Sequence, residues 1–164
     1  MVLKIFQKGF NYSQDGQGNR LVYHLQGCNM RCRWCANPEG MPAGGAMIRE
    51  KDKSPRLSYE EHPVDEVYEE ILSCKPMFFD GGGVTFSGGE ATMQFGALKE
   101  LLKRLKEAGI HTAIETNGTH ARLEELFPYV DQLIMDCKHW DEGKHLQYTG
   151  VPFSLVYENL KKAA

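Results

Sequence analysis

Short apolar segments alternate along the chain with segments of helical period. Four segments rich in strand-forming residues are expected to be β-strands, and four others are expected to be helices. The expected strands are residues 20–26, 83–88, 110–116 and 130–136, and the expected helices are residues 63–75, 93–109, 120–127 and 154–164. This order predicts four units, each a strand followed by a helix.

The two longest central helices carry clear apolar stripes. In the first, Val64, Val67, Tyr68 and Ile71 stand at positions i, i+3, i+4 and i+7, and Pro63 suits a first helical turn. The stripe of the second helix consists of Phe95, Leu98, Leu102 and Leu105, with Gly109 as its natural end.

Repeated strand–helix units predict an α/β fold with a parallel sheet and right-handed crossovers. In such sheets the chemistry lies at the carboxyl ends of the strands. Here a cysteine-rich segment follows the first strand, SGGE (87–90) the second, ETNG (115–118) the third and MDCK (135–138) the fourth. Because these four motifs fall at one edge of the sheet, we expect a single site there.

Composition adds only broad limits. The chain has 164 residues, of which 41% are hydrophobic and 25% charged, and these values are ordinary for one globular domain. A net charge of −3 gives no reason to expect binding to nucleic acid or to an anionic membrane. We find neither a signal-peptide pattern nor an apolar run of membrane-spanning length, and we expect a cytoplasmic protein.

The chain has five cysteines, an odd number that argues against a closed set of disulfides. Cys28, Cys32 and Cys35 crowd into a C-x3-C-x2-C segment, which is typical of metal ligands in a reducing compartment. Cys74 and Cys137 stand alone, and we expect both to be small buried hydrophobic residues.

Three interpretations compete for the three crowded thiols. A zinc site needs a fourth ligand, and His24, four residues before Cys28, is an available but awkward one. A redox pair of Cys32 and Cys35 leaves Cys28 without a role. A [4Fe–4S] cluster held by three thiolates leaves one iron open for a small molecule.

The cysteine spacing, with Trp34 just before the last cysteine, resembles the radical S-adenosylmethionine superfamily. The resemblance implies one [4Fe–4S] cluster on Cys28, Cys32 and Cys35, with S-adenosylmethionine on the open iron and Trp34 beside the cofactors. It also implies that the reduced cluster cleaves S-adenosylmethionine into methionine and a 5′-deoxyadenosyl radical, while the protein supplies geometry and a dry pocket.

SGGE resembles the GGE motif of the same superfamily. The resemblance implies that Gly88, Gly89 and Glu90 bind the amino group of the methionine moiety, because glycines let the backbone approach and a carboxylate suits an ammonium group. A tight turn between strand and helix is the structural alternative.

ETNG and MDCK resemble a narrower group, the activating enzymes of glycyl-radical enzymes, to which pyruvate formate-lyase activase belongs. The resemblance implies a monovalent cation held by Glu115, Thr116 and Asp136 beside the cosubstrate carboxylate. It also implies that Lys138 reaches into the site, as the candidate catalytic residue. The family often has aspartate where this chain has Glu115.

YSQDGQGNR (12–20) resembles the D-G-x-G-x-R segment of the same activases, although a β-turn at Asp15 and Gly16 is the structural alternative. Activases typically build six strand–helix units in an open barrel. The resemblance therefore implies a partial parallel (β/α) barrel with about four of the family's six units. Residues 1–164 are expected to form a single radical S-adenosylmethionine domain, incomplete at its C-terminus unless the chain is a short natural member.

Partners follow from the same resemblance. The protein substrate would be a glycyl-radical enzyme, and no nucleic acid or membrane is expected. Residues 36–80 contain only Cys74, so we expect one cluster, with electrons from an external flavodoxin or ferredoxin. Lys51, Lys53 and Arg56 could form a docking patch for an acidic partner, although a solvated loop is the simpler interpretation.

Three functions are compatible with these motifs. The first is an activase that abstracts a hydrogen atom from a backbone glycine of a partner enzyme, and ETNG, D-x-K and D-G-x-G-x-R favour it. The second is a radical enzyme acting on a small molecule, such as a deazapurine synthase. The third is a truncated cluster-binding module without turnover.

Overall fold

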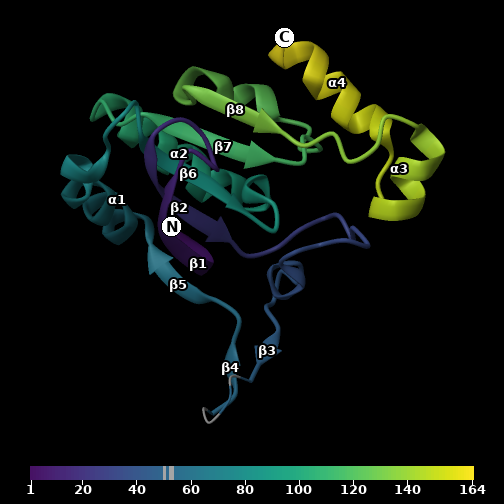
Figure 1. Ribbon diagram of the computed structural model, residues 1–164, viewed down its shortest axis with the longest axis horizontal. Helices are drawn as coiled ribbons and strands as arrows, with labels where there is room; N and C mark the ends of the chain where they lie inside the picture. Colours follow the sequence, from purple (N-terminus) through teal and green to yellow (C-terminus); the bar gives the residue numbers. More distant parts are fainter. Residues whose placement is uncertain (50, 52–53) are drawn as a thin grey trace.

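A sheet with the strand order β5-β1-β2-β6-β7-β8 forms the centre of the molecule (Figure 1). The computed structural model describes residues 1–49, 51 and 54–164. Its strands are β1 (Val2–Tyr12), β2 (Asn19–Leu25), β3 (Met47–Ile48), β4 (Arg56–Leu57), β5 (Glu60–Pro63), β6 (Gly83–Gly88), β7 (Thr112–Thr116) and β8 (Gln132–Met135). Its α-helices are α1 (Val64–Ser73), α2 (Phe95–Glu107), α3 (Glu142–Thr149) and α4 (Phe153–Ala163). Short 3-10 helices cover Pro38–Gly40, Lys75–Met77, Ala91–Gln94 and Leu123–Tyr129.

The four predicted strands are confirmed as β2, β6, β7 and β8, and they pair in parallel in that order. The register places His24 opposite Ser87, and Glu115 opposite Ile134. Their carboxyl ends therefore lie at one edge of the sheet, which confirms the predicted α/β fold with a parallel (β/α) core.

Two antiparallel strands, which the sequence analysis did not predict, extend the sheet beyond β2. β1 pairs with β2 as a hairpin, and β5 pairs with the outer edge of β1. Only the first half of β1 alternates between buried and exposed positions, while residues 7–12 are largely exposed. Because its second half lacks the period-two pattern, β1 gives a weak strand signal.

The predicted helices have three outcomes. α1, α2 and α4 are confirmed, but residues 120–127 do not form an α-helix. Leu123–Tyr129 is a 3-10 helix that contains Pro128, which has no N–H to donate to an α-helical ladder. α3 was not predicted, although Asp141 caps it through the Lys144 N–H at 2.8 Å and the left-handed Gly150 ends it.

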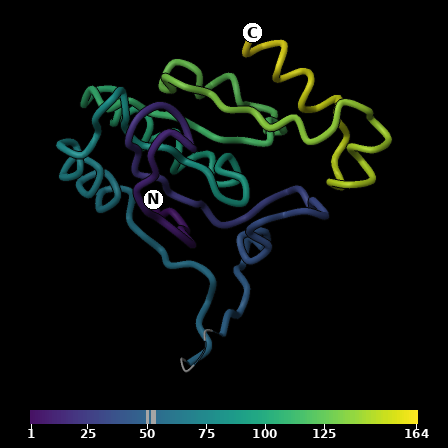
Figure 2. Tube along the Cα trace, in the orientation of Figure 1, coloured from purple at the N-terminus to yellow at the C-terminus, as the bar shows by residue number. Residues whose placement is uncertain are grey.

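The main hydrophobic core lies between the sheet and helices α1 and α2, which cover its rear face in Figure 1. Both apolar stripes contribute to it, and Val67, Ile71, Leu98 and Leu102 are almost fully buried. A smaller second core joins Met30 of the cysteine segment to Val151 and Val156, at the α3–α4 end of the chain. Figure 2 shows that the segment around residue 30 and the turn near residue 150 lie at the same end of the molecule.

The expectation that Cys74 and Cys137 are both buried is wrong for Cys137. Cys74 is half-buried and packs on the main core, but Cys137 is exposed and not buried. Asp136 and Lys138 on either side of Cys137 both line the cavity described below, so the intervening side chain is directed elsewhere.

Lys51 is exposed, Arg56 lies in β4, and Lys53 falls outside the described residues, so the basic patch proposed there stays a prediction. Among the described residues, no helix has the length and apolar character to span a bilayer.

Candidate cofactor-binding site

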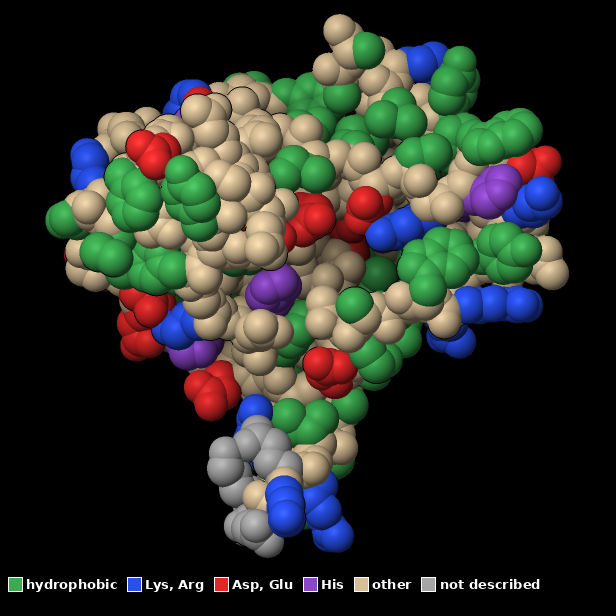
Figure 3. Space-filling model, viewed as in Figure 1, with side chains coloured by type: hydrophobic (Ala, Val, Ile, Leu, Met, Phe, Trp, Pro, Cys, Tyr) green, Lys and Arg blue, Asp and Glu red, His purple; other side chains and the backbone are tan. Residues whose placement is uncertain are grey.

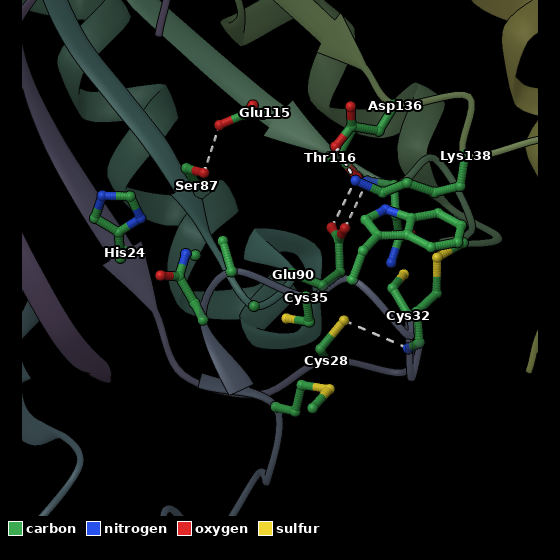
Figure 4. A pocket seen from close by; sticks show the side chains of 18 of the residues that line it. His24, Cys28, Cys32, Cys35, Ser87, Glu90, Glu115, Thr116, Asp136 and Lys138 are labelled. Atoms are coloured by element: carbon green, nitrogen blue, oxygen red, sulfur yellow. Dashed lines mark hydrogen bonds and ion pairs between the residues drawn. The ribbon is translucent and has the colours of Figure 1, made fainter. Parts of the chain in front are cut away.

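A cavity of about 370 Å³ opens at the carboxyl ends of β2, β6, β7 and β8 (Figure 4). The structure brings every predicted site residue to this one cavity. They are Cys28, Cys32, Trp34, Cys35, Gly88, Gly89, Glu90, Glu115, Thr116, Asp136 and Lys138. Four sequence motifs separated by up to 110 positions thus share a wall, as their placement after parallel strands predicts.

The cysteine loop is closed at its base by backbone hydrogen bonds. The Gly27 N–H donates to Gly40 O at 2.8 Å, and the Cys28 N–H donates to Met41 O at 2.9 Å. The buried Gln26 side-chain amide donates to two carbonyls beyond the loop, at 2.8 and 2.7 Å. These bonds fix both ends of the segment that carries the three thiols.

The tip of the same loop is held by residues far along the chain. The Arg31 N–H donates to Thr149 O at 2.7 Å, and the Arg33 N–H donates to Tyr148 O at 3.2 Å. Because Thr149 and Tyr148 form the last turn of α3, its free carbonyls accept these bonds. Met30 is 1% exposed and packs with the second core, so both backbone bonds and apolar packing position the thiols.

The three thiols are free and half-buried. Burial raises the pKa of Cys28 to about 11, and burial also raises the pKa of Cys32. In the part of the chain that the structure describes, no three His, Cys, Asp or Glu side chains converge on one point as a single metal ion requires. A [4Fe–4S] cluster spreads its thiolate ligands over different irons, and a ring of separate thiols around a cavity suits it better.

The packing around SGGE requires glycine at both of its glycine positions. A Cβ on Gly88 would lie 2.2 Å from Leu25 N, and a Cβ on Gly89 would lie 2.5 Å from Gly40 O. Gly88 also has φ of +129°, which other residues rarely adopt. The Gly89 and Glu90 N–H groups donate to Leu25 O at 3.0 Å and Gly27 O at 2.7 Å, so this turn packs directly on the base of the cysteine loop.

Glu90 is almost completely buried, and its carboxylate joins three segments. Oε1 accepts hydrogen bonds from the Thr92 N–H at 2.9 Å, from the Thr92 hydroxyl and from the Thr116 hydroxyl at 2.7 Å. Oε2 accepts from the Asn117 N–H at 2.7 Å. Oε2 accepts this one hydrogen bond only, so it is the oxygen of the carboxylate that keeps capacity for a further donor.

The ends of β7 and β8 bring further charges to the cavity. The Ser87 hydroxyl donates to Glu115 at 2.6 Å, and Lys138 pairs with Asp136 at 2.6 Å. Burial, helped by the charges of Asp15 and Asp136, raises the pKa of Glu115 although the bond from Ser87 opposes it. Burial alone would lower the pKa of Lys138, but its bond to Asp136 and the surrounding negative charges outweigh burial and raise it.

The structure supports the position of the predicted cation site but does not show free ligands for a cation. Glu115, Thr116 and Asp136 all line the cavity, but each already has a partner within the chain. Thr116 donates its hydroxyl to Glu90 and accepts the Asp136 N–H at its carbonyl, at 2.9 Å. A cation beside Asp136 would have to compete with the ammonium group of Lys138, so cation binding stays a prediction.

Two residues that line the cavity, His24 and Asn117, were not predicted from the sequence as part of this site. His24 was considered only as a zinc ligand, yet it lies on the far side of the cavity from the cysteines in Figure 4. Its Nδ1 is buried without a partner among the described residues, and burial lowers its pKa. Asn117 ties the cysteine loop to ETNG by donating to Asn29 Oδ1 at 2.9 Å. The place of His24 near the carboxyl end of the predicted strand 20–26 could have indicated it, whereas nothing local indicates the Asn29 contact.

The D-G-x-G-x-R segment forms the loop of the β1–β2 hairpin. Arg20 is fully buried and donates to the Thr85 hydroxyl at 2.6 Å and to Val84 O at 2.7 Å. The Thr85 hydroxyl in turn donates to Asp15 O at 2.7 Å, and the Asp15 side chain reaches the cavity wall. The segment is therefore both a turn and a support of the cavity.

The fold and this cavity define a radical S-adenosylmethionine domain, and comparison with known proteins agrees. The family model described as the Radical SAM superfamily matches residues 22–164, and the chain belongs to that superfamily. It is 38% identical over 157 residues to the pyruvate formate-lyase-activating enzyme of Staphylococcus epidermidis (strain ATCC 12228 / FDA PCI 1200), and 40% identical over 157 residues to that of Staphylococcus aureus (strain USA300). Each match covers 90% of this chain and 58% of the relative, so the chain spans little more than half the length of these curated relatives.

Two solved structures share the fold. Escherichia coli QueE has a TM-score of 0.52 at 21% identity, covering 73% of this chain and 55% of that chain. Streptococcus suis SuiB, solved with its precursor peptide SuiA, has a TM-score of 0.59 at 19% identity, covering 86% of this chain and 29% of that chain. At these identities the likeness concerns the fold alone.

Membership of the superfamily gives this chain a [4Fe–4S] cluster and S-adenosylmethionine as cofactors. The cavity fits both groups. Cys28, Cys32 and Cys35 offer three thiolates for the cluster, and the spare capacity of Glu90 Oε2 suits an ammonium group. Asp15, Glu90, Glu115 and Asp136 outnumber the single lysine on the wall, which suits a ligand with a cationic sulfonium.

We expect His145 to position the cysteine loop. His145 is fully buried, and its Nδ1–H donates to Val151 O at 2.6 Å, which fixes the turn that follows the carbonyls of α3. His145→Leu should lower the free energy of unfolding by about 1 kcal/mol, because it removes this hydrogen bond and leaves Val151 O with only the longer bond from the Thr149 hydroxyl, at 3.3 Å. Urea unfolding of the apo chain measures this, and the half-life of the reconstituted cluster should fall as well.

His145→Asn is the matched control, because an asparagine amide can occupy the place of Nδ1–H and keep the bond to Val151. It should retain most of the stability and most of the cluster lifetime. Equal losses in both variants would show that ring packing, and not this hydrogen bond, holds the loop.

Proposed function

We propose that the chain is the cluster-binding part of an activating enzyme for a glycyl-radical enzyme. The proposed reaction removes a hydrogen atom from a backbone glycine of the partner and leaves a glycyl radical. When bound, the reduced cluster and S-adenosylmethionine supply the radical chemistry, releasing methionine and, after hydrogen transfer, 5′-deoxyadenosine.

One observation carries the proposal. The chain is about two-fifths identical to several pyruvate formate-lyase-activating enzymes over 157 residues, and that span is long enough to take in most of the motifs on the cavity wall. ETNG and MDCK, which resemble this narrower group, both reach the cavity through Thr116, Asp136 and Lys138. A site built only for cluster binding has no evident need of these segments.

The chain's own residues divide the work as follows. The three cysteines would hold the cluster, and Glu90, with the backbone of Gly88 and Gly89, would bind the amino group of the cosubstrate's methionine moiety. Lys138 is fixed by Asp136 at 2.6 Å and keeps two further N–H donors for a carboxylate or a ribose oxygen.

Electrons for the proposed reaction come from an external flavodoxin or ferredoxin. Free thiols suit a reducing compartment, and we place the protein in the cytosol.

The test is anaerobic mixing of the reduced, reconstituted chain with S-adenosylmethionine and a candidate glycyl-radical enzyme. We expect 5′-deoxyadenosine and a glycyl-radical resonance to appear together. Extending the chain to the full length of its relatives should increase both, since the added residues restore the remainder of the relatives' sequence. Rapid consumption of a small organic substrate without any protein partner would instead assign the chain to the second class of function.

A further inference from the structure

Aromatic side chains gather next to the cysteine loop, at the edge of the cavity that Trp34 lines. Trp34 meets Tyr148 edge-on with ring centroids 5.8 Å apart, and His139 lies 6.3 Å from Tyr148 and 5.9 Å from Trp140. Trp34 and Trp140 are 52% and 78% exposed. Exposure of two tryptophans within one cluster is unusual for a surface that contacts only water.

Positive charges border these rings. Arg33 lies over the Tyr148 ring at 5.4 Å, and Lys144 stands four positions before Tyr148 on the same face of α3. Arg31 and Arg33 are exposed, and within the residues that the structure describes neither guanidinium pairs with a carboxylate. Figure 3 shows hydrophobic side chains at the right of the molecule, with Lys or Arg side chains directly below them.

The carboxylates nearest in sequence are engaged elsewhere. Asp141 accepts the Lys144 N–H at 2.8 Å as the cap of α3, and Glu142 accepts the Ser154 N–H at 2.9 Å. Among the described residues no ion pair joins Arg31, Arg33 or Lys144 to a carboxylate, although the chain as a whole has a net charge of −3. Local positive charge on a negative protein favours and orients an acidic partner.

The positive charges lie next to the cluster ligands, which indicates a partner that delivers an electron to the cluster. Arg31 and Arg33 are the covalent neighbours of Cys32, so a protein seated on them comes within the thickness of one loop of the thiols. Of the residues around these rings, Trp34 lines the cavity, whereas Arg31, Arg33, Trp140, Lys144 and Tyr148 do not. A partner seated mainly on these five residues can thus approach the thiols without filling the cavity.

We propose that the surface formed by Arg31, Arg33, Trp34, Trp140, Lys144 and Tyr148 docks a small acidic protein that carries one electron. The carrier's flavin or iron–sulfur centre is oxidised by one electron, and the cluster on Cys28, Cys32 and Cys35 is reduced by one. The proposal rests on the proposed function only in requiring that the cluster be reduced.

Charge reversal tests the surface. Arg31→Glu combined with Arg33→Glu should weaken binding of a flavodoxin at least tenfold, measured by calorimetry on the chain without its cluster. The matched control is Lys161→Glu combined with Lys162→Glu at the far end of α4, which changes the net charge equally and should leave binding within twofold.

Electron transfer gives a second readout on the reconstituted chain. Stopped-flow reduction of the cluster by reduced flavodoxin should be at least tenfold slower in the variant with Arg31→Glu and Arg33→Glu, and its rate should no longer depend on salt concentration. Reduction by dithionite should be unchanged, because a small reductant needs no docking surface. Dithionite-driven cleavage of S-adenosylmethionine is assayed in parallel, so failure of the proposed function is visible separately.

Trp140→Ala provides a second test in case the variant with Arg31→Glu and Arg33→Glu binds less iron than the parent. Trp140 is remote in sequence from the cysteine loop and highly exposed, so its replacement should not disturb the cluster. It should weaken flavodoxin binding at least threefold and leave the iron content unchanged. Unchanged flavodoxin binding in both variants overturns the proposal. So does an equal loss in the α4 control, or a loss of glycyl-radical enzyme binding while flavodoxin binding persists.

Discussion

Replacing Cys28, Cys32 or Cys35 by serine is expected to abolish the iron–sulfur cluster. Each thiol is half-buried on the cavity wall, whereas neither Cys74 nor Cys137 lines the cavity. A [4Fe–4S] site that loses one of only three protein thiolates has too few ligands to persist. Iron content after anaerobic reconstitution should fall from about four per chain to below about one.

Cys137→Ser and Cys74→Ser are the matched controls for this series. Cys137 is exposed, and Cys74 packs on the main core at the end of α1. Both variants should bind iron like the parent. Undiminished iron in a Cys32→Ser variant, or a loss of iron in Cys137→Ser, would assign the ligands differently.

Glu90→Gln is expected to weaken binding of S-adenosylmethionine by at least about tenfold, or about 1.4 kcal/mol, because the charge facing its ammonium group is removed. The same change should lower the free energy of unfolding by about 1–3 kcal/mol. The glutamine amide is itself a donor, and all four groups that bond Glu90 are donors already. Calorimetric titration of the reconstituted chain measures the affinity, and urea unfolding measures the stability.

Thr92→Val separates the two effects. It removes one hydroxyl donor from Glu90 but keeps the carboxylate and its N–H bond. Stability should fall by about 1 kcal/mol, while affinity for S-adenosylmethionine changes less than threefold. If Thr92→Val weakens ligand binding as much as Glu90→Gln, then Glu90 serves the turn and not the ligand.

Local patterns predicted the parallel core and the position of the site. Strands β2, β6 and β7 are mostly buried, β8 is half-buried, and the motifs follow these strands directly in the chain. Topology then brings the motifs to one edge of the sheet. The same logic fails for β1, whose exposed second half has no period, and for Cys137, whose position depends on which neighbours face the cavity.

The supports of the site could not be predicted, because they are contacts between distant segments. The carbonyls of Tyr148 and Thr149 hold the tip of a loop that lies more than 100 residues earlier. Glu90 is held by donors from ETNG, and Asn29 is held by Asn117. Residue type at each position allows such bonds, but only the fold selects them.

The measurement that tests the account most directly is electron paramagnetic resonance of the reduced, reconstituted chain with and without S-adenosylmethionine. With about four irons per chain, the account predicts the signal of a reduced [4Fe–4S] cluster that changes on addition of the cosubstrate. The change should be absent in Glu90→Gln at cosubstrate concentrations that saturate the parent. Stoichiometric zinc without iron uptake, or a cluster signal that S-adenosylmethionine leaves unaltered, would contradict the assignment of this cavity.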